Sequence, residues 1–182
     1  NEGDERNRPV DLQLALGFDA FTSGVNVRGS VPPQLALDFA VGYTFGAVDA
    51  PARFRLGGFL GSTSLVENTT PSNKIGFVSA LLEPSLRVRV VPRRVYLLFG
   101  VGVGVLGVSN LKINSVLLAR QARAINGTIA LFETRFAAGL QVHLSPAWML
   151  TMTPAFSISP QRAAFYGPIG RFELMFGLGY SF

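Results

Sequence analysis

The strongest constraint on the fold of this chain is a strict alternation of large apolar residues with small or polar residues. Successive side chains of an extended strand point to opposite faces, so every second residue shares a face. Over residues 173–182, this alternation places an apolar set on one face: Leu174, Phe176, Leu178, Tyr180 and Phe182. The opposite face receives a small or polar set: Glu173, Gly177, Gly179 and Ser181. The C-terminus is therefore predicted to be a strand with one apolar face that ends on an aromatic residue.

Seven further segments show the same alternation, which predicts eight strands in total. Their approximate ranges are 10–21, 34–45, 53–64, 77–90, 95–108, 128–144, 149–159 and 169–182. The connections alternate in length, with long segments such as 63–76 and 109–127 and short turns at 46–52, 91–94 and 145–147. Pro84 and Pro154 lie inside two of these strands. Because proline donates no backbone hydrogen bond, we expect a bulge or a missing ladder bond at each.

Composition excludes several other kinds of protein. The 182 residues are 48% apolar and 15% charged, which fits one folded domain and not a disordered chain. Glycines interrupt the charge-free stretch 95–110, so it does not supply the roughly 20 apolar residues of a membrane-spanning helix. Cysteine is absent, which excludes disulfides and thiolate metal sites. The net charge of +5 comes mainly from dispersed arginines, and this predicts no binding of nucleic acid.

Residues 102–107 match the GxGxxG pattern of dinucleotide-binding proteins. That function requires a strand that ends at the glycines and a helix that begins there. In this chain, valines continue the alternation through the glycines. We therefore interpret these glycines as residues that make room in a crowded interior.

The eight alternating segments, the alternating connection lengths and the terminal strand ending in Phe182 resemble the small bacterial outer-membrane β-barrels of the OmpA and OmpX type. The resemblance implies an all-β fold, with an eight-stranded antiparallel up-and-down transmembrane β-barrel at residues 10–182 after a polar tail at residues 1–9. It also implies a place in the bacterial outer membrane with both termini periplasmic. In that family the barrel-assembly machinery recognises the C-terminal strand, which assigns this signal to Phe176, Leu178, Tyr180 and Phe182.

Alternation alone does not say which face is outside, because soluble barrels such as lipocalins turn their apolar face inward. The interior of an eight-stranded barrel is only just wide enough for side chains. The apolar face of these strands is too bulky for that space, whereas the other face is rich in Gly, Ala, Ser and Thr. We therefore expect the apolar face to meet lipid. An aromatic girdle near the short turns would then contain Tyr43, Phe45, Trp148, Tyr180 and Phe182.

With the polar face inside, the lumen would collect the charged residues of the strands. They are Asp11, Asp19, Asp38, Arg53, Arg55, Glu83, Arg87, Arg89, Glu133, Arg135, His143, Arg171 and Glu173. Ionised groups in so tight a space must be paired or hydrated, so we expect a charge network. Asp19 and Arg171 should be adjacent where the first and last strands meet, and the arginines at 53, 55, 87 and 89 should cluster near the periplasmic mouth. The network predicts a lumen closed by salt bridges, and the alternative is a narrow pore that favours anions.

Some proteins with this kind of barrel are enzymes, among them lipid A deacylases and palmitoyltransferases. A Ser-His-carboxylate arrangement would need the single histidine, His143, beside a serine at the level of the outer leaflet. His143 instead precedes the short turn at Ser145, at the periplasmic end and on the lumen face. We therefore predict no catalytic residues and no cofactor, and a lone histidine makes no convincing metal site.

The long connections carry a basic rim, with Arg28, Lys74, Lys112, Arg120, Arg123 and Arg162 against Glu67. This rim could meet the phosphates of lipopolysaccharide. Residues 114–124 have a helix-favouring composition and could form a short helix over the mouth or bind a partner. We predict a non-enzymatic structural or docking protein whose partners are outer-membrane lipids, lipopolysaccharide, the barrel-assembly machinery and, through the loops, other envelope proteins. The alternatives are a narrow solute channel and a lipid-modifying enzyme.

Overall fold

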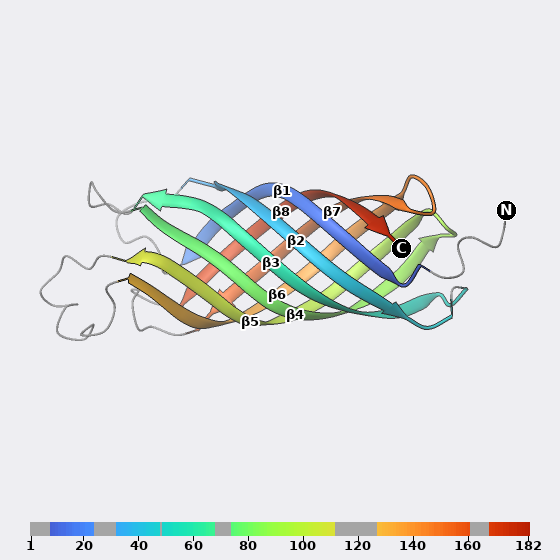
Figure 1. Ribbon diagram of the computed structural model, residues 1–182, viewed down its shortest axis with the longest axis horizontal. Coiled ribbons are helices and arrows are strands. Elements are labelled where there is room, and N and C mark those ends of the chain that lie inside the picture. Colours follow the sequence, from blue (N-terminus) through green and yellow to red (C-terminus); the bar gives the residue numbers. More distant parts are fainter. Residues whose placement is uncertain (1–7, 24–31, 48, 68–73, 112–126, 161–167) are drawn as a thin grey trace, which may run out of the picture.

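The computed structural model describes residues 8–23, 32–47, 49–67, 74–111, 127–160 and 168–182. They form eight strands: β1 (Val10–Ser23), β2 (Gln34–Phe45), β3 (Ala52–Glu67), β4 (Lys74–Val91), β5 (Val95–Leu111), β6 (Gly127–His143), β7 (Trp148–Ser159) and β8 (Ile169–Ser181). Each strand pairs antiparallel with its neighbours in the chain, and β1 also pairs with β8, so the sheet closes into a barrel (Figure 1). The predicted eight-stranded up-and-down barrel is confirmed. No helix in the described part of the chain is long and apolar enough to cross a membrane.

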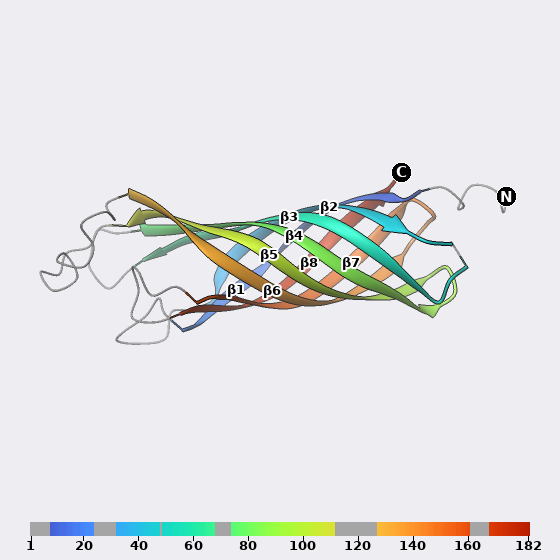
Figure 2. The same cartoon turned by 90° about the horizontal axis from the view of Figure 1, so that it is seen from below.

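The two ends of the barrel differ in their connections. Short connections at residues 46–51, 92–94 and 144–147 lie at the end where β1 begins and β8 finishes (Figure 1, Figure 2). We call this end the turn end. The opposite end, which we call the loop end, is where the other four connections leave the strands. Three loop-end connections, at residues 24–33, 112–126 and 160–168, are longer than any at the turn end, as the sequence predicted. The fourth, at residues 68–73, is only as long as the turn at 46–51.

Four strands, β1, β3, β4 and β5, extend two or three residues farther toward the loop end than the sequence predicted. β3 continues to Glu67 and β4 begins at Lys74, so both run into the segment 63–76 that was predicted to be a loop. The register shifts between Thr63 and Val66, and pairing then resumes. β5 is lengthened in the same way by an irregularity near its loop end. Such an irregularity breaks the alternation in the sequence without ending the strand, which is why the predicted loops were too long.

The two prolines inside strands each interrupt one hydrogen-bond ladder. Pro84 lies in β4, where the pairing with β5 stops after Leu82 and resumes at Ser85 in the same register. Pro154 lies in β7, and the pairing of β7 with β6 is interrupted around it in the same way. The ladders on the other side, with β3 and β8, run through both prolines. The predicted loss of a ladder bond is confirmed, and it occurs without a register shift.

The outer surface of the barrel is apolar. Leu14 on β1 and Phe176 on β8 are 56% and 53% exposed, and large apolar side chains are also exposed on each of the six strands β2 to β7. At the turn end, aromatic rings contact one another in two groups: Tyr43 with Phe45, and Trp148 and Phe182 with Tyr180. A soluble monomer rarely exposes continuous apolar surface of this extent, so the surface suits a hydrocarbon environment. The apolar face is therefore outside, as predicted.

The glycine motif at residues 102–107 lies within β5 and does not end a strand. A dinucleotide-binding motif requires the strand to end at the glycines and a helix to begin there, so this interpretation is excluded. A Cβ at Gly102 would lie 3.4 Å from both Arg135 and Leu81, and one at Gly100 would lie 3.0 Å from Glu83. These glycines leave room for the large side chains that fill the lumen.

Replacing Gly104 by alanine is expected to destabilise the barrel. An added Cβ would overlap the carbonyl oxygen of Ala80 and lie 2.9 Å from the Cα of Leu81, both backbone atoms of the neighbouring strand. Because these atoms cannot move without disturbing strand pairing, the free energy of unfolding should fall by about 1–3 kcal/mol. Urea unfolding in lipid bilayers measures this change. Gly58→Ala is the control, since an added Cβ there meets nothing within 4 Å, and an equal loss in both variants would contradict the explanation.

Candidate functional site

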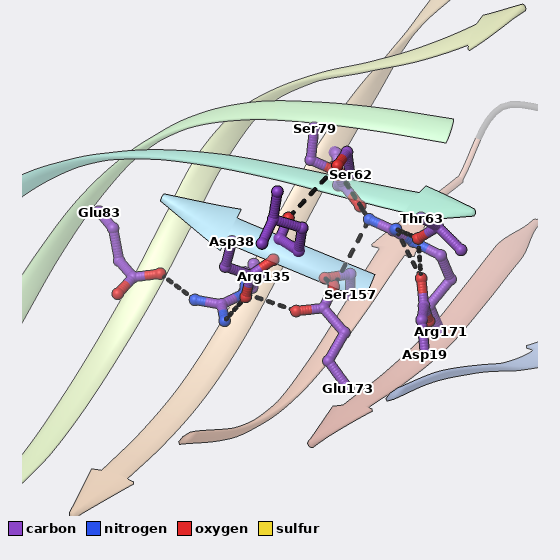
Figure 3. Close-up of polar contacts among 12 residues, drawn as sticks. Asp19, Asp38, Ser62, Thr63, Ser79, Glu83, Arg135, Ser157, Arg171 and Glu173 are labelled. Carbon is purple, nitrogen blue, oxygen red and sulfur yellow. Dashed lines mark hydrogen bonds and ion pairs between the residues drawn. The ribbon is translucent and has the colours of Figure 1, made fainter. Parts of the chain in front are cut away.

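The charged side chains of the lumen form two groups along the barrel axis. The first group lies in the middle of the barrel and toward the loop end, and we call it the core network. Its members are Asp19, Asp38, Glu83, Glu133, Arg135, Arg171 and Glu173, and all seven are buried. Figure 3 shows the labelled carboxylates of this network gathered around the guanidinium groups of Arg135 and Arg171, with serine and threonine side chains beside them.

Arg171 of β8 is the centre of the loop-end part of the core network. Its Nη1 donates to Oδ2 of Asp19 at 2.9 Å, and its Nη2 donates to Oγ of Ser79 at 2.6 Å and to Oε1 of Glu133. Thr63 donates its hydroxyl to the same oxygen of Asp19 at 2.5 Å. Asp19 lies on β1, so this ion pair spans the seam between the first and last strands, as the sequence predicted.

Arg135 of β6 is the second centre. Its Nη1 donates to Oε2 of Glu83 at 2.5 Å, and its Nε donates to Oε2 of Glu173 at 3.1 Å. The guanidinium also lies 4.0 Å from the centre of the Phe59 ring, a cation–π contact. Glu173 is 3.6 Å from Arg171 as well, so this carboxylate links the two arginines into one network.

The core network contains more negative than positive charge. Five carboxylates share two guanidinium groups, and Asp38 is 3.9 Å from Nη2 of Arg135, beyond hydrogen-bond distance. Oδ1 of Asp19 and Oε2 of Glu133 are buried without a hydrogen-bond partner. A buried carboxylate is costly unless it is paired and hydrogen-bonded. The two arginines are therefore the residues on which the stability of this region depends.

An apolar layer closes the lumen on the loop-end side of the core network. Inward-facing side chains form it: Phe21, Phe77, Leu106, Val108 and Ile169. Phe77, Leu106 and Val108 have no exposed surface, and the ring centroids of Phe21 and Phe77 are 4.7 Å apart. This apolar layer was not predicted from the sequence. An eight-stranded interior has to be filled, and large apolar side chains fill it where the charges end.

A small cavity lies between the core network and the turn end. Its volume is about 40 Å³, which accommodates about three water molecules. Asp38, Glu83 and Arg135 of the core network line it on one side, and Arg55 and Gln13 line it toward the turn end. Apolar side chains such as Phe59, Leu98 and Met175 complete its wall. The core network and then the apolar layer close the lumen on its loop-end side.

The second group of charges lies at the turn end, and we call it the mouth cluster. Its members are Asp11, Arg53, Arg55, Arg87, Arg89 and His143. Arg55 donates from Nε and Nη2 to the two carboxylate oxygens of Asp11, at 2.8 and 2.6 Å. An added Cβ at Gly42 would overlap the Arg55 guanidinium, so glycine makes the room for it. Arg89 donates from Nη2 to the backbone carbonyl of Asp49 at 3.0 Å. Four arginines and one carboxylate make this end of the lumen basic.

All thirteen residues that the sequence assigned to the lumen occupy inward-facing strand positions, but the structure divides them into two groups. The core network and the mouth cluster are separated by the cavity and differ in the sign of their surplus charge. Three hydroxyl side chains belong to the network without having been predicted: Thr63, Ser79 and Ser157. Thr63 and Ser157 donate to its carboxylates, and Ser79 accepts from Arg171. The alternation of residues was the signal that placed these hydroxyls inside.

Comparison with solved structures identifies the fold. No family model matches the chain, and no curated protein matches it in sequence. The N-terminal β-barrel domain of OprF from Pseudomonas aeruginosa has a TM-score of 0.59 at 10% identity, covering 97% of this chain and 100% of that one. Neisserial surface protein A has a TM-score of 0.64 at 12% identity, covering 95% and 97%. Ail, the attachment invasion locus protein of Yersinia pestis, has a TM-score of 0.51 at 16% identity, covering 96% and 99%.

The fold is that of a small outer-membrane β-barrel. The C-terminal strand β8 and the residue after it place the four residues of the predicted assembly signal on the outer face of the barrel. Phe176, Leu178 and Phe182 are exposed, and Tyr180 is half-buried between aromatic neighbours. Phe182 also donates its backbone N–H to the carbonyl of Val10 at 2.9 Å, which ties the end of the chain to β1. The side chains of the predicted signal therefore point outward from the barrel.

The imidazole of His143 is engaged by an arginine side chain and not by a serine hydroxyl. Nη2 of Arg87 lies 2.6 Å from Nε2 of His143, and because arginine only donates, Nε2 must be the acceptor. The ring of Tyr96 packs against the imidazole at 5.2 Å between centroids. The hydroxyl of Ser145 accepts hydrogen bonds from the backbone of the turn. Within the described ranges, no serine hydroxyl bonds to the imidazole and no cluster of potential ligands could hold a metal ion.

Most of the predicted loop features of the barrel lie outside the described residues. This is the case for Arg28, Lys112, Arg120, Arg123 and Arg162 of the basic rim and for the predicted helix at residues 114–124. Glu67 and Lys74 are described, and their backbones pair at the loop end of β3 and β4. The contacts proposed for the rim stay predictions.

Proposed function

We propose that this protein is a non-enzymatic integral protein of the bacterial outer membrane, a structural or docking barrel whose lumen is closed. Its turn end and both ends of the chain face the periplasm under this proposal, since outer-membrane barrels have short periplasmic turns and longer external loops. The apolar outer face, with its aromatic groups at the turn end, supports the membrane placement. Outer-membrane lipids, lipopolysaccharide and the barrel-assembly machinery are its proposed partners, with other envelope proteins at the loop end.

The observation that carries this proposal is the double closure of the lumen. A conducting pore needs a hydrated path lined by groups that bind solutes only weakly. Here Phe77 and Leu106 of the apolar layer have no exposed surface, and Arg135 and Arg171 of the core network are at most 3% exposed. A solute would have to displace both obstacles. The function is therefore proposed to lie on the outer surfaces of the barrel and not along a path through it.

Planar-bilayer recordings test the closure. The refolded protein, first shown to be folded by its heat-modifiable migration on a gel, should give no discrete conductance steps. Arg135→Met alone should also stay silent, because the apolar layer still blocks the lumen. Adding Phe77→Ala and Leu106→Ala to that variant should produce steps, since both obstacles are then reduced. This triple variant shows that the assay detects an open lumen.

Two results would contradict the proposed function. Discrete steps from the unmodified protein would favour the narrow solute channel. A mass change of lipid A in cells that make the protein, lost in His143→Gln, would favour the lipid-modifying enzyme. The hydrogen bond from Arg87 occupies Nε2 of His143, and no serine hydroxyl of the described residues bonds to the imidazole; both observations support a non-enzymatic protein.

A further inference from the structure

Two arginines of the mouth cluster have no acidic partner in the described part of the chain. Arg53 on β3 and Arg87 on β4 are directly opposite each other in the strand ladder. Like charges at directly opposed positions repel and destabilise the pair of strands. Asp11, the carboxylate of the mouth cluster, is already held by Arg55 through two hydrogen bonds. The repulsion between Arg53 and Arg87 is therefore not neutralised by a described side chain.

Donor groups of both arginines are also unused. Nε of Arg53 and Nε of Arg87 are buried and have no hydrogen-bond partner. Arg87 is nevertheless held in place, with its guanidinium 4.0 Å from the centre of the Tyr96 ring and its Nη2 bonded to His143. A buried donor without an acceptor costs about 1–3 kcal/mol. Oriented guanidinium groups with free donors are suited to an acceptor that enters from solution.

The core network limits how far an anion could travel. An anion entering from the turn end would first meet the surplus of arginines in the mouth cluster. Beyond the cavity it would meet the surplus carboxylates of the core network, with Asp38 and Glu83 at the cavity wall. Attraction at the mouth and repulsion farther inside favour retention at the mouth.

We propose that the turn end of the lumen is a binding site for a phosphate-type oxyanion, held between Arg53 and Arg87. The planar guanidinium fork offers paired N–H donors that match two oxygens of a phosphate group, so two arginines can hold one such group. The two negative charges of the oxyanion would neutralise the opposed arginines. Binding at the mouth requires no passage through the barrel, so the site is compatible with a closed lumen and independent of it.

Isothermal titration with inorganic phosphate tests the site directly. The folded barrel in a non-ionic detergent, in low-salt buffer without other oxyanions, should bind phosphate saturably. Arg53→Gln and Arg87→Gln should each weaken binding about tenfold or more, the effect of losing a hydrogen bond to a charged group. Arg94→Gln is the matched control, because Arg94 lies exposed in the neighbouring turn and its loss removes the same net charge.

Either of two results would overturn the proposal. One is the absence of saturable binding by the folded protein. The other is an equal weakening in all three variants, which would mean that phosphate responds only to net charge. Heat-modifiable migration of each variant shows that the comparison is made between folded barrels.

The same phosphate chemistry is present in free phosphate and in the headgroups of phospholipids. Repeating the titration in bilayers of phosphatidylcholine, with and without phosphatidylglycerol, separates these sources. Equal phosphate affinity in both bilayers assigns the site to a free oxyanion. Weaker phosphate binding in the presence of phosphatidylglycerol, seen in the wild type and lost in Arg53→Gln, assigns it to an anionic lipid headgroup.

Stability provides a readout that a merely structural role for Arg53 would not give. In phosphate-free buffer of low ionic strength, Arg53→Gln should raise the urea midpoint, because it relieves the repulsion with Arg87. Phosphate should raise the midpoint of the wild type, since a ligand that binds the folded state stabilises it, and should have little effect on the variant. A lower midpoint for Arg53→Gln without phosphate would show that Arg53 already has a stabilising partner and would overturn the proposal.

Discussion

Arg171→Met is expected to lower the free energy of unfolding by about 3–5 kcal/mol, the usual effect of removing one partner of a buried ion pair. Arg171 contacts Asp19 and Glu133 and lies 3.6 Å from Glu173, and all of these carboxylates are buried. Methionine fills similar space but leaves the three carboxylates without this cation. Arg135 still pairs with Glu173, but it already serves Glu83 as well, so Asp19 and Glu133 are left without a cation. Urea unfolding in lipid bilayers measures the loss.

Two control variants separate the charge explanation from a general sensitivity of the lumen. Glu133→Gln removes one of the surplus carboxylates and keeps an oxygen that accepts from Arg171, so stability should change by less than about 1.5 kcal/mol. Arg94→Met removes an exposed arginine and should have a smaller effect still. If Glu133→Gln destabilised the barrel as much as Arg171→Met, the surplus of negative charge would not be the cause.

Leu14→Arg is expected to cost about 2–4 kcal/mol of folding free energy in a bilayer. Leu14 is the fifth of the 14 residues of β1, well inside the strand, on the outer face, and is 56% exposed. An arginine at that depth would place a charge in the hydrocarbon, where neither water nor a partner is available. The measurement is unfolding from bilayers, compared with Leu14→Ala, which removes the same apolar contacts without adding charge.

A position near the membrane surface is the depth control for this prediction. Leu144 follows β6 at the turn end and is 63% exposed. Leu144→Arg should cost only about 0–1 kcal/mol, because arginine is tolerated near the interface. An equal cost at both positions would contradict the proposed position of the bilayer around the barrel.

The fold could be predicted because its dominant interaction repeats every two residues. β2 was predicted with the bounds that the structure shows, since its apolar and small residues alternate without exception from Gln34 to Phe45. The strand ends near the loop end were harder to predict, because a register irregularity such as that between Thr63 and Val66 shifts the alternation while the strand continues. The hydrophobic pattern therefore predicts the strands well and their ends less well.

The arrangement inside the lumen was only partly predictable. Alternation indicates the face on which a side chain lies but not its height along the axis, which depends on the tilt of the strands. Asp19 and Arg171 could be paired in advance because they lie on the adjoining first and last strands. The contact of Arg135 on β6 with Glu83 on β4 crosses the lumen between strands that are not neighbours, and no local pattern predicts it.

The apolar layer did have a signal in the sequence. Leu106 and Val108 have the same parity as the inward-facing Gly100, Gly102 and Gly104 of β5. Continuing the alternation past Gly104 would have placed the side chains of Leu106 and Val108 in the lumen. The inward-facing residues of β5 change from small to large between Gly104 and Leu106. This change marks where the lumen is filled by apolar side chains and no longer by charged ones.

The charges inside the lumen are distributed unevenly along the barrel axis. Six arginines and six carboxylates balance over the whole lumen, yet the surplus arginines lie at the turn end and the surplus carboxylates lie deeper inside. This arrangement is a permanent dipole along the axis. If such a lumen were widened, its basic and acidic segments in series would form a bipolar junction, which fills with ions under one voltage polarity and is depleted under the other. A widened lumen would then conduct ions better under one voltage polarity than under the other. The closed barrel already has the charge arrangement that such rectification requires.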